Sequence, residues 1–245
     1  MSDRAARARS FESVAAEYER HRPGYPEEAL RWAADRLGLE PGARVLDVGA
    51  GTGKLTRGLV AMGFEVVAVE PGAPMLAQLR TAVPEAETLV AAAESIPLGD
   101  ESVAAAFAGQ AYHWFDRERA LPELQRVIRP GGGLVLLWNW WNDRDPLQRE
   151  LGELVGFAGH DPYQQDDLPG APWFHEVGRT IVEADQESSP DALVGHLSTA
   201  SAFLTAEPEQ REEWLRAVHE LASRYGDRFT LPRLTYVFAF SRLAG

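Results

Sequence analysis

The residues best suited to chemistry lie in a glycine-rich run over Asp47–Gly53, between a short apolar segment and a helical pattern. Glycines at positions 49, 51 and 53 allow a tight turn and let a ligand approach the backbone closely. Glu70 ends the next apolar segment, where an acid can accept hydrogen bonds from both hydroxyls of a ribose. Together these two features predict a nucleoside-binding site.

Local sequence separates the cofactor classes that use such a site. A phosphate-binding P-loop needs glycine where Val48 stands and serine or threonine where Leu55 stands. A dinucleotide fingerprint needs glycine at Lys54, and the acid Asp47 is unexpected beside a pyrophosphate. Asp47 instead suits a cationic ligand such as the ammonium group of a methionine moiety. The alternative, that the glycines only turn the chain, is less favoured because a strand-end acid is also present.

The elements that must position these residues alternate along the chain. Helical patterns cover residues 4–20, 26–37, 54–62, 73–82, 117–128 and 146–158, and two further helical stretches precede the final strand. Apolar runs of strand character are ARVLDV, FEVVAVE, TLVAAA, SVAAAFAG, GLVLLWNW, VGRTIVEAD and LTYVFAFSR. Strands that alternate with helices predict an α/β fold with a mostly parallel sheet covered on both faces.

The run VLDVGAGTGKLT followed by VVAVEPGAPML resembles the first two motifs of the class I S-adenosylmethionine-dependent methyltransferases. The segments AAAESIPL, GQAYHWFD and VIRPGGGLVLLWN are similar to the family's next three strand motifs, so the resemblance spans about residues 10–142. With the leading FESVAAEYERHRPGYP, it points to the small-molecule branch that includes trans-aconitate-type enzymes. The resemblance implies a Rossmann-like, seven-stranded, mostly parallel sheet.

The same resemblance suggests one domain over residues 1–245. We expect an amino-terminal helical lid over 1–40, a cofactor-binding core over 41–142, and carboxy-terminal strands and helical insertions over 143–245 that shape the substrate side. The expected cofactor is S-adenosylmethionine, with S-adenosylhomocysteine as product and no metal. The implied cofactor-binding residues are Tyr18, Arg22, Asp47, Gly49, Ala50, Gly51, Gly53, Glu70, Pro71, Met75, Ala93, Glu94 and Gln110.

Two positions depart from the pattern of the family. Ala92 stands where an acid is frequent, which shifts adenine recognition towards Glu94 or main chain. Ala104 replaces an aspartate that is common in the fourth strand, and this difference concerns strand packing.

Methyl transfer is an in-line displacement that needs an aligned nucleophile and, for some acceptors, a base. His113, just after the fourth strand, is a candidate base or substrate-orienting residue, and Tyr18 is the second catalytic candidate. A packed corner formed by His113 and Trp114 beneath the cofactor is equally favoured. Arg22 precedes a Pro-Gly break and could clamp a carboxylate, whereas Tyr25 is expected on a solvated helix surface.

Aromatic residues follow the fifth strand. Alternation places Trp138 and Trp140 on one face, so we expect them, with His113 and Trp114, to line a substrate pocket, although core packing is the alternative for each. The remaining histidines lack metal-ligand spacing, so solvated or capping roles are expected for His160, His175, His196 and His219.

The composition limits the partners. The net charge is −13, no basic stripe is present, and the chain has no cysteine, so nucleic-acid partners, disulfides and thiolate sites are disfavoured. No apolar run is long enough for a membrane span and the amino terminus lacks a secretory pattern, so we expect a cytoplasmic protein. The near absence of lysine is typical of GC-rich bacterial coding. The oligomeric state is not predicted.

The expected function is methyl transfer to an oxygen, nitrogen or carbon of a small molecule. Two alternatives stay open: a catalytically silent adenosyl-binding module, and a methyltransferase that acts on a protein. Fold alone does not select among them.

Overall fold

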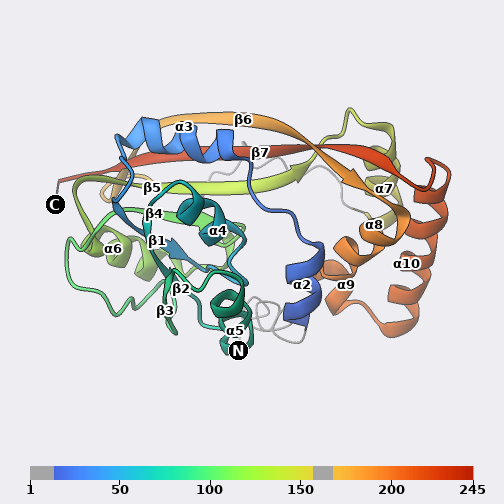
Figure 1. The fold of residues 1–245 in the computed structure, drawn as a ribbon, viewed down its shortest axis with the longest axis horizontal. Helices are drawn as coiled ribbons and strands as arrows, with labels where there is room; N and C mark the ends of the chain where they lie inside the picture. The colour runs from blue at the N-terminus through green and yellow to red at the C-terminus, as the bar shows by residue number, and fades with distance from the viewer. Residues whose placement is uncertain (1–13, 157–167, 245) are drawn as a thin grey trace.

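The computed structural model describes residues 14–156 and 168–244, and Figure 1 shows their arrangement. The first half of the helix expected over 4–20 lies outside these residues. The elements, in chain order, are α2 Ala15–His21, α3 Glu27–Leu37, β1 Arg44–Val48, α4 Lys54–Ala61, β2 Glu65–Val69, α5 Ala73–Ala82, β3 Glu87–Leu89, β4 Val103–Gly109, η2 Tyr112–Trp114, α6 Arg117–Val127, β5 Ile128–Trp141, α7 Pro146–Val155, β6 Phe174–Ser188, α8 Pro190–Ser198, α9 Ser201–Thr205, α10 Pro208–Ser223 and β7 Phe229–Arg242.

The seven strands form a sheet in the order β3-β2-β1-β4-β5-β7-β6. Strands β1 to β5 pair in parallel, whereas β7 is antiparallel to both β5 and β6. The chain order reverses between β1 and β4, which is the place where ligands bind in open α/β sheets. The predicted Rossmann-like, mostly parallel seven-stranded sheet is confirmed.

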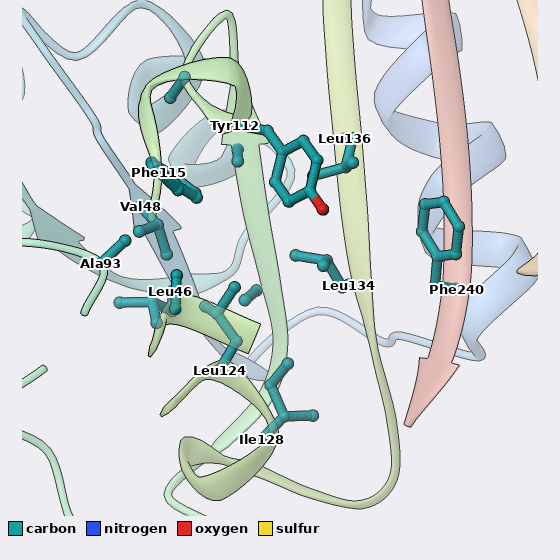
Figure 2. Close-up of a cluster of buried hydrophobic side chains, with 14 of the residues drawn as sticks. Leu46, Val48, Ala93, Tyr112, Phe115, Leu124, Ile128, Leu134, Leu136 and Phe240 are labelled. Atoms are coloured by element: carbon teal, nitrogen blue, oxygen red, sulfur yellow. The ribbon is translucent and has the colours of Figure 1, made fainter. Parts of the chain in front are cut away.

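Side chains alternate between the two faces of the sheet, so each face builds its own core. On one face Leu46 and Val48 of β1 pack with Leu124 of α6 and Leu134 of β5 (Figure 2). On the other face Val45 packs with residues of α3 and α4. The buried Ala104 of β4 belongs to this second cluster, as expected for a strand-packing position.

A third apolar cluster lies beyond the carboxyl end of the sheet, where α7, α8, α9 and α10 gather (Figure 1). Phe203 and Leu193 are fully buried in it. The long strands β5 and β7 run from the sheet core to these helices, because β5 continues for four residues after Leu137, its last partner to β4. The carboxy-terminal part of the chain therefore contains a cluster of helices, α7 to α10. This cluster faces the carboxyl end of the parallel strands, which is the end where ligands bind.

Three expectations differ from the structure. Residues 26–37 do not act as a lid, because α3 buries Ala29, Leu30 and Ala33 against the sheet. The fifth strand is longer than the expected run GLVLLWNW, because β5 already begins at Ile128 and includes the glycines after Pro130, where a Cβ on Gly132 would stand 2.2 Å from the carbonyl oxygen of Ala104. The segment between β6 and β7 holds three helices instead of two.

Candidate cofactor and acceptor site

The loop after β1 and the acid after β2 meet through hydrogen bonds. The backbone N–H of Gly51 donates to Glu70 Oε2 at 3.0 Å, and the N–H of Gly72 donates to Glu70 Oε1 at 2.8 Å. Gly51 has a φ of 57°, and a Cβ placed there would meet no atom closer than Met75 Cε at 3.5 Å. The glycine turn is therefore held in shape by Glu70 while its outer side stays open to a ligand.

Asp47 lies in β1 beneath this loop and is 1% exposed. Its Oδ2 accepts a hydrogen bond from Thr56 Oγ1 at 2.6 Å, whereas Oδ1 is buried with no hydrogen-bond partner. The pKa of Asp47 is raised to about 7, mainly by burial and to a smaller extent by the charge of Glu70, while the hydrogen bonds from Thr56 oppose both effects. A buried carboxylate with one unsatisfied oxygen is suited to a cationic group of a ligand.

The segment from α2 to Tyr25 lies over the loop after β1. Lys54 at the start of α4 donates to the carbonyl oxygen of Glu19, and its Nζ is 3.4 Å from Glu19 Oε1. Arg57 donates to the same Oε1 at 2.8 Å. These contacts dock α2 on the helix that carries the glycine loop.

Arg22 follows α2 and reaches the end of α8. Its Nε donates to the buried Thr199 Oγ1 at 2.9 Å, and its guanidinium carbon lies 5.2 Å from the centre of the Tyr18 ring. The surface position expected for Tyr25 is wrong, because a Cβ on Gly109 would stand 2.4 Å from the Tyr25 hydroxyl. Tyr25 thus packs on the end of β4, which only glycine at 109 allows.

The segment after β4 turns sharply into the site. Gln110 has a φ of 54°, an uncommon conformation for a residue with a side chain, and its amide Nε2 donates to the carbonyl oxygen of Asn139 at 2.7 Å. Asn139 in turn donates from Nδ2 to the carbonyl oxygen of Gly24 at 2.9 Å. One hydrogen-bonded chain therefore links the ends of β4 and β5 to the segment after α2.

His113 is oriented by a core tryptophan. Trp138, only 2% exposed, donates from Nε1 to His113 Nδ1 at 3.4 Å and makes edge contacts with Tyr112 and Phe238. Because Nδ1 accepts this bond, the proton of a neutral His113 is on Nε2. In this tautomer His113 can orient an acceptor by donating a hydrogen bond, and proton removal would require loss of the contact with Trp138.

A cavity of about 1560 Å³ connects these features. Ligand pockets are commonly about 300–1,000 Å³, so this one has room for two molecules. Of the residues proposed from the sequence, those on its lining are Tyr18, Arg22, Asp47, Gly49, Ala50, Gly51, Glu70, Pro71, Met75, Ala93, Glu94, Gln110, His113, Trp114, Trp138 and Trp140. Gly53 is not on the lining. It caps the start of α4, and a Cβ there would stand 2.9 Å from Leu79 of α5, so its role is helix packing.

Sequence reasoning missed the far wall of the cavity. Arg233, His196 and Trp141 line it, together with apolar residues of α7 and α8. The solvated or capping role expected for His196 is wrong, because this residue is 6% exposed. His175 and His219 do lie at the surface, and His160 is outside the described residues. The sequence around Arg233 does not indicate that it lines a cavity, because its neighbours there come from distant segments of the chain.

The described residues contain neither a metal-ligand cluster nor a membrane-spanning helix. Within residues 14–156 and 168–244, no group of three or more His, Asp or Glu side chains could hold a metal ion. In the same described part of the chain, no helix is long and apolar enough to cross a membrane.

The fold and the site together define a class I methyltransferase architecture: a seven-stranded sheet with its last strand antiparallel, a glycine loop after β1 and an acid after β2. A methyltransferase-domain family model matches residues 46–136. An uncharacterized methyltransferase of Mycobacterium bovis is 44% identical over 218 residues, which cover 88% of this chain and 86% of that protein. The chain therefore belongs to the class I methyltransferase family.

Solved structures agree with this assignment. A structure named as a type II methyltransferase of Anaeromyxobacter dehalogenans has a TM-score of 0.70 and 28% identity, covering 91% of this chain and 99% of that one. Phosphoethanolamine N-methyltransferase 2 of Haemonchus contortus, solved with S-adenosylhomocysteine, has a TM-score of 0.55 and 16% identity. The similarity covers 95% of this chain and 58% of that one. The second similarity shows the shared fold.

Proposed function

We propose that this chain transfers a methyl group from S-adenosylmethionine to a small-molecule acceptor, as one methyltransferase domain that works without a metal. The observation that carries the proposal is the hydrogen bond between the Gly51 backbone and Glu70. Both residues line a cavity large enough for a cofactor and a second molecule. A cavity lined on one side by Tyr18 and Arg22 of the amino-terminal segment suits a small acceptor better than a protein chain. The fold neighbour from Haemonchus contortus was solved with phosphomonomethylethanolamine and S-adenosylhomocysteine, which agrees with a small acceptor and with this cofactor.

The residues on the lining fit the cofactor. Glu70 is placed to accept hydrogen bonds from the ribose hydroxyls, with Pro71 and Met75 beside the adenine. Asp47 Oδ1, buried and without a partner, suits the ammonium group, and Arg22 is placed for the carboxylate. Ala93, Glu94 and the backbone of Gln110 lie on the lining for the adenine edge and the sulfonium side.

When bound, S-adenosylmethionine supplies an electrophilic methyl group on sulfur. The protein then has to align the acceptor in line with that group and exclude water. Tyr18 and His113 are our candidates for contacts with the reacting acceptor, with His113 as a donor from Nε2. Trp114, Trp138 and Trp140 form an aromatic wall on the same side.

The test is calorimetric titration with S-adenosylhomocysteine, followed by transfer of a labelled methyl group into a metabolite extract. We expect micromolar binding in the wild type and loss of binding in Gly51→Val, whose side chain would occupy the ligand's space at a positive φ. Glu70→Gln should weaken binding about tenfold, since one acceptor oxygen becomes a donor facing backbone N–H groups and ribose.

The outcomes distinguish the possible functions. No heat of binding in the folded wild-type protein would overturn the proposal. Binding without label transfer to any small molecule would favour a silent adenosyl-binding module, and label recovered only in protein would favour a protein acceptor.

A further inference from the structure

The far wall of the cavity contains a buried arginine for which the described residues offer no counter-ion. Arg233 of β7 is 8% exposed, and its Nε is buried without a hydrogen-bond partner. Its guanidinium carbon lies 5.6 Å from the centre of the Trp141 ring, which supports the planar group from one side. Among the described residues, no carboxylate oxygen lies within 4.0 Å of Arg233 or of Arg22.

A buried charge without a partner is costly, so such groups are normally paired or bind a ligand. Burial, together with the positive charge of Arg22, lowers the pKa of Arg233 to about 10. Arg233 is still protonated at neutral pH with this value. The acids Asp143 and Glu153 also line the cavity, but both are exposed.

The cofactor does not account for both arginines. S-adenosylmethionine carries a single carboxylate, which we have placed with Arg22. Arg233 pairs across the ladder with Trp141, four residues beyond Leu137, where β4 ends beside β5. At about 3.3 Å per residue, Arg233 lies roughly 13 Å further along the strand than the level at which the parallel sheet ends. Arg22 is close enough to Arg233 for its charge to lower the pKa of Arg233, so the single carboxylate of the cofactor leaves one of these two positive charges for a second anionic group.

The wall of the cavity beside Arg233 is formed by a neutral histidine and by apolar side chains. His196 of α8 has its ring centre 6.0 Å from that of Trp141, and its Nδ1 is buried without a hydrogen-bond partner. Burial, followed by the charges of Arg22 and Arg233, holds the pKa of His196 well below its usual range, so this histidine is neutral at pH 7. Leu151, Val155 and Leu197 continue the wall with apolar side chains.

We propose that Arg233 binds an anionic group of the methyl acceptor, a carboxylate or a phosphate, and that the apolar part of this acceptor lies along Leu151, Val155 and Leu197. The proposal rests on the proposed methyltransferase function, because it concerns the acceptor half of the same cavity. Arg233 is thus a specificity-determining residue, since its two-pronged guanidinium recognises a carboxylate or phosphate and rejects a neutral group of the same shape. His196 adds a neutral hydrogen-bonding group beside it.

The experiment measures binding of three probes to the protein saturated with S-adenosylhomocysteine, by calorimetry. Benzoate and phenyl phosphate carry the two candidate anions, and benzamide is a neutral match for benzoate. We expect at least one anion to bind ten times more tightly than benzamide. The stronger of the two anions identifies the acceptor group as carboxylate or phosphate.

Two variants test the residue itself. Arg233→Met keeps the apolar stem over Trp141 and should abolish the preference for the anion without changing affinity for S-adenosylhomocysteine. Arg233→Lys keeps the charge and loses the planar fork, so it should retain a weakened preference. The matched control is Arg36→Met, because Arg36 lies 5.3 Å from the ring centre of Trp32 on α3, away from the cavity lining.

The outcomes separate this proposal from the proposed function. Equal binding of benzoate, phenyl phosphate and benzamide to the cofactor-bound wild type would overturn the anion site and leave the methyltransferase proposal intact. An anion preference that persists in Arg233→Met would also overturn it, since the anion would then bind elsewhere. Absence of S-adenosylhomocysteine binding would instead refute the proposed function, and the three probes would then be compared on the protein alone.

Discussion

Two acids of the site have opposite surroundings, although they end neighbouring strands. Glu70 accepts two backbone N–H groups and keeps the glycine turn in shape. Asp47 is enclosed by protein, and only Thr56 donates to it among the described residues. The pKa of Asp47 is therefore raised to about 7, so its charge depends on the pH range in which the protein works.

The raised pKa of Asp47 predicts a pH-dependent cofactor affinity. An ammonium group binds the ionised carboxylate, so affinity for S-adenosylhomocysteine should fall as pH decreases below about 7, by up to about tenfold per pH unit. Calorimetry between pH 8 and pH 6 measures this change. Asp47→Asn should bind more weakly and show a flat profile, and a wild-type profile as flat as that of the variant would contradict the assignment of Asp47.

Stability of the unliganded protein should change in the opposite direction. Between about pH 4 and pH 7 the folded state keeps a proton on Asp47 that the unfolded chain has lost. This group therefore destabilises the fold as pH rises to 7, and its contribution is constant above that value. Compared with wild type, Asp47→Asn should lose this part of the pH dependence in urea titrations.

At the scale of elements, α2 lies along the cavity and contributes Tyr18 to its lining. It is attached on one side to α4 through Glu19, Lys54 and Arg57, and on the other side to α8 through Arg22 and Thr199. The ion pair of Arg57 with Glu19 is partly exposed and contributes little by itself, and the residue of α2 that is buried is Ala15. A short helix held in this way can open at a modest free-energy cost.

We predict that residues 14–25 are more protected from hydrogen exchange when S-adenosylhomocysteine is bound, because the ligand adds contacts to Tyr18 and Arg22. Arg22→Ala should lower the affinity by about 1.5–3 kcal/mol if a charge-assisted hydrogen bond to the carboxylate is lost. The control is Arg20→Ala, since Arg20 is 67% exposed and pairs only with Glu17 among the described residues. Equal affinity in both variants, with no ligand-dependent protection, would remove the lid from the mechanism.

At the scale of the whole molecule, the cavity lies between two bodies with separate apolar cores. The sheet and its covering helices carry the glycine loop, and the cluster of α7 to α10 carries the far wall. Strands β5 and β7 belong to both bodies and connect them (Figure 1). This arrangement places the residues that we propose for the cofactor mainly on the first body, and Arg233 and His196 beside the second.

Substitutions in the two cores should therefore have different consequences. Phe203→Ala removes a fully buried ring from the helical cluster and should cost about 3–5 kcal/mol of stability. It should weaken acceptor binding while S-adenosylhomocysteine still binds to the folded fraction. Leu46→Ala, in the sheet core beneath the loop, should cost about 2–5 kcal/mol and weaken cofactor binding as well. Urea unfolding and calorimetry on both variants measure the difference, and an identical loss of cofactor affinity would contradict it.

The sequence by itself determined the parallel half of the fold and the wall of the cavity around the glycine loop. Short apolar strands, glycines at fixed spacing and a strand-end acid are local signals, and the ends of adjacent parallel strands necessarily meet at one edge. For this reason the residue types and their spacing were enough to group Asp47, Gly51 and Glu70 in one site. The sequence could not distinguish the packing role of Gly53 from the ligand-facing role expected for Gly49 and Gly51. The reason is that a side chain at Gly53 would clash with Leu79, which belongs to another helix.

Only the tertiary structure decided the far wall of the cavity. Arg233, His196 and Trp141 come from β7, α8 and β5, and their proximity depends on an antiparallel register and on a helical cluster that has no repeating signal in the sequence. Whether a histidine or arginine is buried also depends on segments far away in the chain, which is why a solvated role was expected for His196. Local sequence patterns indicate which residues follow a strand. The burial of Arg233 without a counter-ion, in contrast, depends on how distant segments assemble around the cavity.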